Sequence, residues 1–170
     1  MAITTSRAGV VTDALVALLK AVPALADPVR VYDGPATNTD TMWTQAIFVG
    51  FSGDWHATPL GQTNPGSYTA MLINHERPYV GPTSNFEQLE IECVAAIWTG
   101  DTDVQGARNQ VLALWATVET VTRTDPSIGI DGSTITDIRT GVLEYGFDDG
   151  GNIGAAIRFT IAVKTALLTV

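Results

Sequence analysis

The chain has 170 residues, and 18 acidic residues against nine basic ones give it a formal net charge of −9. This length is typical of one domain, which buries roughly two thirds of its unfolded surface and needs no disulfide or metal to fold. The acidic charge and the lack of a basic cluster argue against nucleic-acid binding, because a protein that grips duplex DNA replaces counterions with Lys and Arg.

A single cysteine, Cys93, excludes an intramolecular disulfide. It falls on the apolar side of an alternating segment, where a small buried residue is far more common than a nucleophile. The amino terminus carries Arg7 and then a short apolar stretch interrupted by Asp13, a poor match to a secretory signal, and no apolar run approaches 18 residues. We therefore expect a soluble protein, made in the cytoplasm, with no membrane partner.

The first predicted element is a helix over residues 6–22, which carries an apolar stripe at helical spacing and has Thr5 or Ser6 as its cap. Short strands are predicted at 29–33 and 45–51. The second strand is apolar almost throughout, which indicates burial on both faces.

A loop-rich region follows over about residues 52–84, broken by a predicted short strand at 68–73. It is too long for an ordinary connection, and long loops on compact domains often make contacts with other molecules. The next predicted strand, 86–98, alternates, so Glu90 and Glu92 lie opposite its apolar set, where they would face Arg158 or Lys164 if the strands are neighbours.

A second helix is predicted from the capping segment 101–103 to the stop at 124–126, with a core-facing apolar stripe. Residues 128–131 are predicted to form a short extended piece. The chain closes with a hairpin that begins near residue 135.

The two strands of that hairpin, within residues 141–167, alternate and are joined by a five-residue turn, 148–152. Antiparallel pairing through this turn puts the apolar residues of both strands on one face, predicted to be core. The predicted opposite pairs are Phe147 with Ile153, Tyr145 with Ala155 and Leu143 with Ile157. The other face is predicted to be polar and available to partners, with Arg158 diagonal to Glu144.

These elements predict a single α+β domain over residues 1–170: a mainly antiparallel or mixed sheet flanked by two main helices, with a long loop-rich insertion. Strand order does not follow from the sequence.

No catalytic, cofactor or metal-binding constellation is visible. Residues 50–54 match a nucleophile elbow only in part, because the fifth position is Asp54 instead of Gly. His56 and His75, with Asp54 and Glu76 beside them, lack the spacing of a metal site and are more typical of surface residues. We predict a protein that is not an enzyme, and two alternatives stay open: a hydrolase or metal-dependent enzyme that uses these histidines, and a small-ligand module with its site between sheet and helices.

The order of elements resembles the tail terminator proteins of long-tailed bacteriophages. The matching segments are an amino-terminal helix, VRVYDGP, AIFVGFSGD, FEQLEIECVAAIWTGD, a helix with LWATVE, and the closing hairpin. The resemblance implies a noncatalytic α/β domain that forms a six-membered ring, caps the finished tail tube and receives the head. The implied partners are further copies of the chain, the major tail tube protein and a head-completion or connector protein. The implied location is the virion tail or neck, and a head-completion or minor tail protein is the alternative.

Aromatic and arginine side chains in the loops are candidates for subunit or tube contacts, because these residue types are typical of interface hot spots. They are Trp55, His56, Arg77 and Tyr79. The alternative is that the loop aromatics pack on their own domain.

Acidic residues are candidates for a negative lumen or rim through which DNA passes without specific binding, because a negative wall does not hold phosphates. They are Glu90, Glu92, Asp148 and Asp149. The alternative is that they are solvated strand and turn residues.

Overall fold

The computed structural model describes residues 4–36, 43–53, 55, 70–76, 86–148 and 150–169. Its elements, in chain order, are β1 (Thr4–Thr5), α1 (Ala8–Lys20), a 3-10 turn (Pro23–Leu25), β2 (Val29–Asp33), β3 (Gln45–Val49), β4 (Met71–Glu76), β5 (Phe86–Trp98), α2 (Val104–Thr124), β6 (Ser133–Phe147), β7 (Ile153–Ala166) and β8 (Leu168–Thr169). The predicted α+β domain, with a mixed sheet and two helices, is confirmed.

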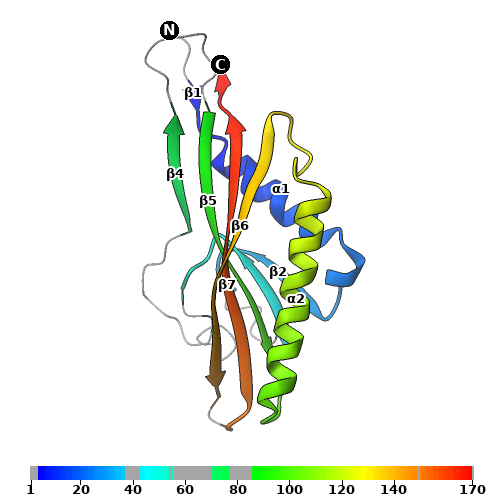
Figure 1. The fold of residues 1–170 in the computed structure, drawn as a ribbon. Coiled ribbons are helices and arrows are strands. Elements are labelled where there is room, and N and C mark those ends of the chain that lie inside the picture. The colour runs from blue at the N-terminus through cyan, green and yellow to red at the C-terminus, as the bar shows by residue number, and fades with distance from the viewer. Residues whose placement is uncertain are drawn as a thin grey trace.

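One sheet has the strand order β2-β3-β5-β7-β6, and β4 also pairs with β5. The β2–β3 pair is parallel and the other pairs are antiparallel. Both helices lie on one face of this sheet, and the two chain ends lie at the end opposite the β6–β7 turn (Figure 1). We call the end of the sheet with that turn the hairpin end.

Most predicted elements are present, with shifted bounds. The first helix is shorter than predicted and begins at Ala8, whose backbone N–H donates to Ser6 Oγ at 3.1 Å. β4 covers residues 71–76 instead of 68–73. The predicted extended piece at 128–131 is wrong: the chain turns there, with Ile128 buried at a φ of 50°. The apolar side chain of Ile128 and its neighbours suggested a strand, but tertiary burial keeps this residue in a turn.

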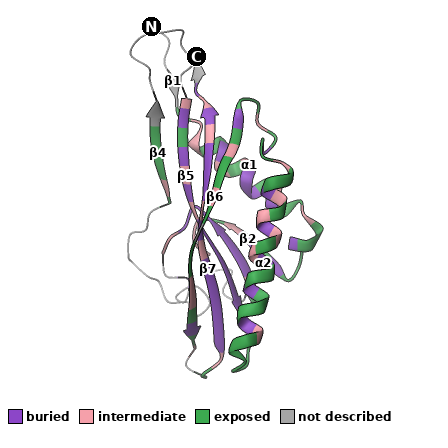
Figure 2. Cartoon of the chain, viewed as in Figure 1, coloured by how far each residue is buried: buried purple, intermediate pink, exposed green. Residues whose placement is uncertain are grey.

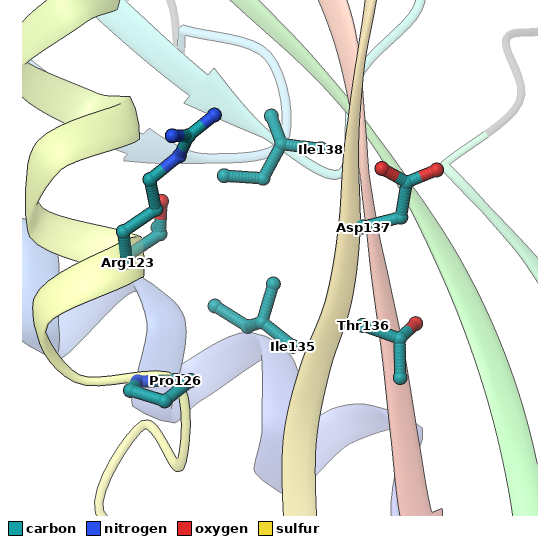
Figure 3. Close-up of a pocket in the computed structure, with 7 residues that line it drawn as sticks. Arg123, Pro126, Ile135, Thr136, Asp137 and Ile138 are labelled. Atoms are coloured by element: carbon teal, nitrogen blue, oxygen red, sulfur yellow. The ribbon is translucent and has the colours of Figure 1, made fainter.

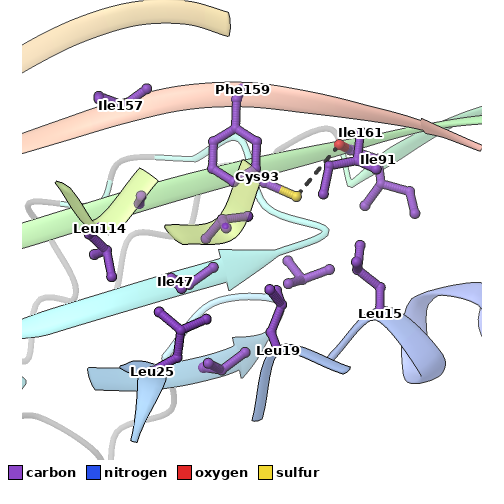
Figure 4. Packing of buried hydrophobic residues seen from close by; sticks show 14 of the residues in the cluster. Leu15, Leu19, Leu25, Ile47, Ile91, Cys93, Leu114, Ile157, Phe159 and Ile161 are labelled. Atoms are coloured by element: carbon purple, nitrogen blue, oxygen red, sulfur yellow. Dashed lines mark hydrogen bonds between the residues drawn. The ribbon is translucent and has the colours of Figure 1, made fainter. Parts of the chain in front are cut away.

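The main core lies between the sheet and the two helices (Figure 4). α1 contributes Leu15 and Leu19, and α2 starts where the Asp103 side chain accepts from Gly106 N at 3.0 Å. Cys93 is buried here, as predicted, and its Sγ lies 3.6 Å from Ile91 O. Burial raises the pKa of the Cys93 thiol to about 12.

A second apolar cluster lies on the opposite face of the sheet, at the hairpin end. Trp43, Phe51 and Trp55, which come before and after β3 in the chain, pack over this face on Phe48 and on smaller side chains of β3, β5 and β7. The rings of Trp55 and Trp98 lie 5.4 Å apart, and Tyr32 stacks on Phe48 at 5.3 Å. The face that alternation predicted to be polar is therefore partly covered by the protein itself.

One charged side chain, Glu87, is buried on the helix face of the sheet. Its Oε2 accepts from the backbone N–H of Arg7 at 2.9 Å, at the positive end of the α1 dipole. The guanidinium of Arg7 donates to the Asp131 carbonyl at 2.9 Å. These bonds hold the start of the chain on the sheet near the end where the chain termini lie.

Candidate subunit interface

Large apolar side chains are exposed on β6 and α2 near the hairpin end. Their exposed fractions are 68% for Phe147, 62% for Val142, 38% for Tyr145, 45% for Val104 and 41% for Leu112. We call these five residues the β6–α2 surface. At 100° per residue, Leu112 lies on the same side of α2 as Arg123, which faces β6 across a pocket. Tyr145 and Phe147, on the helix face of β6, therefore lie on the side of α2 that carries Leu112, whereas Val142 lies beside the register shift on the other face, with Glu144.

The hairpin register that the sequence predicted is confirmed. Phe147 pairs with Ile153, Tyr145 with Ala155 and Leu143 with Ile157. Leu143 packs against the main core, but the prediction that Tyr145 and Phe147 are core residues is wrong.

The reason is the width of the helix layer. Strands lie about 4.8 Å apart and a helix with its side chains is about 10 Å wide, so two helices cover about four strands. At the hairpin end five strands lie side by side, and β6 is the last of them. The β7 partners are buried under α2, whereas most of the hairpin end of β6 is exposed or half-buried (Figure 2).

On the other face of β6, Glu144 connects the hairpin to Trp55 and, through Arg158, to Ser52 and Gly53. Its Oε1 accepts from Arg158 Nε at 2.9 Å and its Oε2 accepts from Trp55 Nε1 at 3.2 Å. Arg158 Nη1 also donates to the carbonyls of Ser52 and Gly53, at 2.6 and 3.0 Å. The predicted diagonal between Arg158 and Glu144 is thus an ion pair, and it fixes the segment that covers the second cluster.

The proposed role of Trp55 in subunit or tube contacts is contradicted, because its side chain is fully buried in its own subunit. Its indole packs on Trp98, and its indole N–H donates a hydrogen bond to Glu144. This outcome is the alternative in which a loop aromatic packs on its own domain. The other three candidates, His56, Arg77 and Tyr79, lie outside the described residues.

Glu90 and Glu92 share the face of β5 that the helices do not cover. Arg139 Nη1 donates to Glu90 Oε1 at 2.9 Å, and its Nε donates to Asp137 at the same distance. The hydrogen bonds to Asp137 and then to Glu90 raise the pKa of Arg139. Glu92 accepts from Thr160 Oγ1 at 3.4 Å. The expected partners Arg158 and Lys164 are not the ones observed for these two carboxylates, because β7 brings Thr160 beside Glu92 and β6 brings Arg139 to Glu90.

Asp148 closes the hairpin turn. Its carboxylate accepts from the backbone N–H groups of Gly150 and Asn152 and from the Asn152 side chain, each at 2.8 Å. These bonds, that of the Asn152 side chain foremost, lower the pKa of Asp148. The β7 partner of Glu92 is Thr160, seven residues past the turn-side end of β7, or about 23 Å at the usual rise per residue. Asp148 therefore forms no common rim with Glu90 and Glu92, and Asp149 lies outside the described residues.

A pocket of about 310 Å³ lies between the end of α2 and β6 (Figure 3). Ile135 and Ile138 point toward α2, while Thr136 and Asp137 point to the other side of the strand. The hydroxyl of Thr122 donates to carbonyls of its own helix, and Arg123 is paired with Glu119. Because these polar groups already have partners, the pocket offers little to a small ligand.

The residues that suggested chemistry do not assemble into a site in the part of the chain that is described. There, no three His, Cys, Asp or Glu side chains are grouped to hold a metal. Asp54 and His56 lie outside the described residues, as does the side chain of His75.

The β6–α2 surface was not predicted, although the sequence held two signals for it. Leu112 departs from the core-facing stripe of α2, whose buried members include Val111, Leu114 and Val118. The alternation of β6 is interrupted near Gly141, where the register with β7 shifts between Thr140 and Leu143 and leaves Val142 exposed.

Searches with the sequence find no matching family model and no matching curated protein. None of the described helices is long and apolar enough to span a membrane.

Proposed function

We propose that this chain is a structural virion protein, the subunit of a ring that caps the tail tube of a long-tailed bacteriophage. In this role it ends tube polymerisation and provides the surface to which the head joins. Its partners are further copies of itself, expected to be six in the ring, the major tail tube protein and a head-side connector protein. The subunit is made in the bacterial cytoplasm and acts in the virion.

The observation that carries this proposal is the β6–α2 surface. Burying a large apolar side chain is worth about 1.5–3 kcal/mol, so exposed residues such as Phe147 and Val142 favour association. They lie at an open edge of a sheet, where a neighbour can also satisfy backbone groups. A subunit that assembles through such an edge fits a structural role, and the order of its sequence elements resembles that of tail terminators.

The charge of the chain fits the passage of DNA. With a net charge of −9 per subunit, a ring repels phosphates, and weak binding favours passage. Glu92 is the candidate for a negative wall, because its described hydrogen bond is to a neutral hydroxyl, whereas Glu90 is paired with Arg139. Asp148 is not a candidate for the same wall, because its carboxylate accepts hydrogen bonds within its own turn.

A head-completion or minor tail protein is the nearest alternative role, and it differs in which virion surface the protein binds. The proposal therefore rests on binding to the tube end.

The test is negative-stain electron microscopy of the purified protein, alone at high concentration and mixed with assembled tail tubes. We expect six-fold rings or added density at one end of each tube, and tubes that stop elongating when the protein is present. A protein that leaves tube ends bare and tube length unchanged would contradict the proposal. Binding to the head-side connector alone would indicate the neck role instead.

A further inference from the structure

We propose that the hairpin-end part of β6, residues 142–147, pairs with β2 of a second copy of this chain. The inference rests on the proposed function, since it identifies the contact between neighbouring subunits of the ring. It joins two unlike edges of the same sheet.

Both edges are open in the described part of the chain. β2 and β6 are the two ends of the strand order, and no described strand pairs with the outer side of either. Past the register shift between Thr140 and Leu143, residues 143–147 pair regularly with β7 and contain no Lys or Pro, the residues that commonly protect an edge from pairing. Two different patches on one subunit produce a head-to-tail contact, which closes into a ring when the rotation allows.

The two edges also lie at the same level of the sheet. Following the strand pairs across it gives one continuous row of Val29, Gln45, Ile97, Ala155 and Tyr145. The row that lies two residues further along β2 ends in Val31 on one edge and Leu143 on the other. β2 runs parallel to β3 and β7 and antiparallel to β6. When a second copy continues the sheet, its β2 therefore meets β6 in the antiparallel sense.

The residues that meet in this register are complementary. Continuing the rows puts Val29 opposite Tyr145 and Val31 opposite Leu143, with the apolar side chains of both copies on the helix face. The row between them puts Arg30 opposite Glu144 on the other face. In the described part of the chain, the ion pair of Arg30 is with Asp27, at 3.6 Å, and both side chains of this pair are exposed. A carboxylate has room for a further donor beside the two that Glu144 already accepts.

An open hollow of about 410 Å³ lies beside β2. Its lining is mixed, because Lys20, Arg30 and Asp33 contribute charged groups beside the apolar Leu25 and Ala26. Phe147 of the second copy comes two residues past the Val29 row, toward Ala26. The side chain that is most exposed on one edge thus comes opposite position 27, next to the Leu25 and Ala26 part of this hollow, which favours a second copy of this chain as the occupant.

Cysteine cross-linking tests the contact directly. Arg30→Cys and Val142→Cys are combined in one chain, because both positions are exposed and diagonal neighbours lie about 7–8 Å apart in the proposed register. A short bismaleimide is added to the protein at high concentration and, separately, to protein bound on tail tubes. The native Cys93 is buried and does not compete. We expect a ladder of covalent oligomers on a denaturing gel.

The matched control combines Val142→Cys with Val10→Cys, which is exposed on α1 but lies on neither edge. We expect about tenfold more cross-linked product from the proposed pair, because an assembled interface raises the local concentration of the two thiols. A second variant, Phe147→Lys, puts a charge at the contact and should abolish rings. Val10→Lys is its control, and melting temperatures establish that both variants are folded.

The outcomes separate this inference from the proposed function. Rings or capped tubes that form without the cross-link, or with Phe147→Lys unaffected, overturn the edge contact and leave the function standing. A ladder in a protein that ignores tail tubes supports the contact and overturns the function. Absence of the ladder in solution and on tubes, with bare tube ends, overturns both.

Discussion

At the scale of single residues, Glu144 decides how the hairpin is joined to the segment that covers it. It lies on an edge strand, yet it accepts from Arg158 and Trp55, and Arg158 in turn binds two carbonyls of residues 52 and 53. One carboxylate thus connects β6, β7 and the buried indole. A charge in this position is worth more than one on the open surface, because its partners are partly shielded from water.

Replacing Glu144 with Gln should lower the free energy of unfolding by about 1–2 kcal/mol, because a neutral amide cannot accept from both Arg158 and Trp55 as the carboxylate does. Denaturant unfolding monitored by tryptophan fluorescence measures the change. The control is Glu90→Gln, which breaks an exposed pair with Arg139 and should cost less than about 0.5 kcal/mol. Equal effects of the two substitutions would contradict the role given to Glu144.

Asp148 makes the stability of the fold depend on pH, and the direction of this dependence follows from its lowered pKa. Its pKa is lowered in the folded protein, chiefly by the Asn152 side chain, so its ionised form stabilises the fold above the pKa of the unfolded chain. That stabilisation is lost as the pH falls through the lowered native pKa. Melting temperatures of the protein and of Asp148→Asn should therefore differ most near neutral pH and converge in acid. A difference in melting temperature that grows as the pH falls would contradict the stabilising role of the ionised Asp148.

At the scale of elements, two glycines show opposite requirements. Gly154 lies where β7 passes under the tryptophans: an added Cβ would lie 2.9 Å from the Ile97 carbonyl oxygen and 3.0 Å from Trp55 Cη2. Gly9 is in the first turn of α1, and an added Cβ there has no neighbour within 4 Å. The first glycine is required by packing, while the second only weakens its helix.

Gly154→Ala should therefore destabilise the protein by about 2 kcal/mol or more, and Gly9→Ala should stabilise it by about 0.5–1 kcal/mol. Thermal and denaturant unfolding of both variants give the comparison. A Gly154→Ala protein as stable as the parent would mean that the sheet and the tryptophans can separate at this point without cost.

At the scale of the whole molecule, Cys93 reports on the integrity of the core. It lies on β5 under both helices, and burial keeps its thiol protonated, with a pKa of about 12. A thiol reagent can therefore reach it only when the core opens.

We expect labelling of Cys93 by a thiol reagent at about pH 8 to be slow and to follow the global unfolding equilibrium. Leu19→Ala, which opens a cavity between α1 and the sheet, should accelerate labelling in proportion to its loss of stability. Mass spectrometry under native conditions measures both rates. Rapid labelling of the unmodified chain would contradict a closed core.

Much of the fold follows from local sequence pattern. The register of the final hairpin was predictable, because an alternating pattern on both sides of a short turn allows only one pairing that puts apolar residues together. α2 was predicted with its cap at Asp103, and β5 with its alternation. The sequence alone therefore determined the α+β class, the main elements and the burial of Cys93.

Only the tertiary structure decided which of these surfaces stay open. Alternation identifies two faces of a strand, but the position of the strand in the sheet determines whether anything covers them, and strand order depends on contacts far apart in sequence. This is why Phe147, predicted to be core, is exposed on the edge strand β6, and why Trp55, a candidate for subunit contacts with packing on its own domain as the alternative, is buried over β5 and β7. The candidate interface arises where two helices are too narrow to cover five strands.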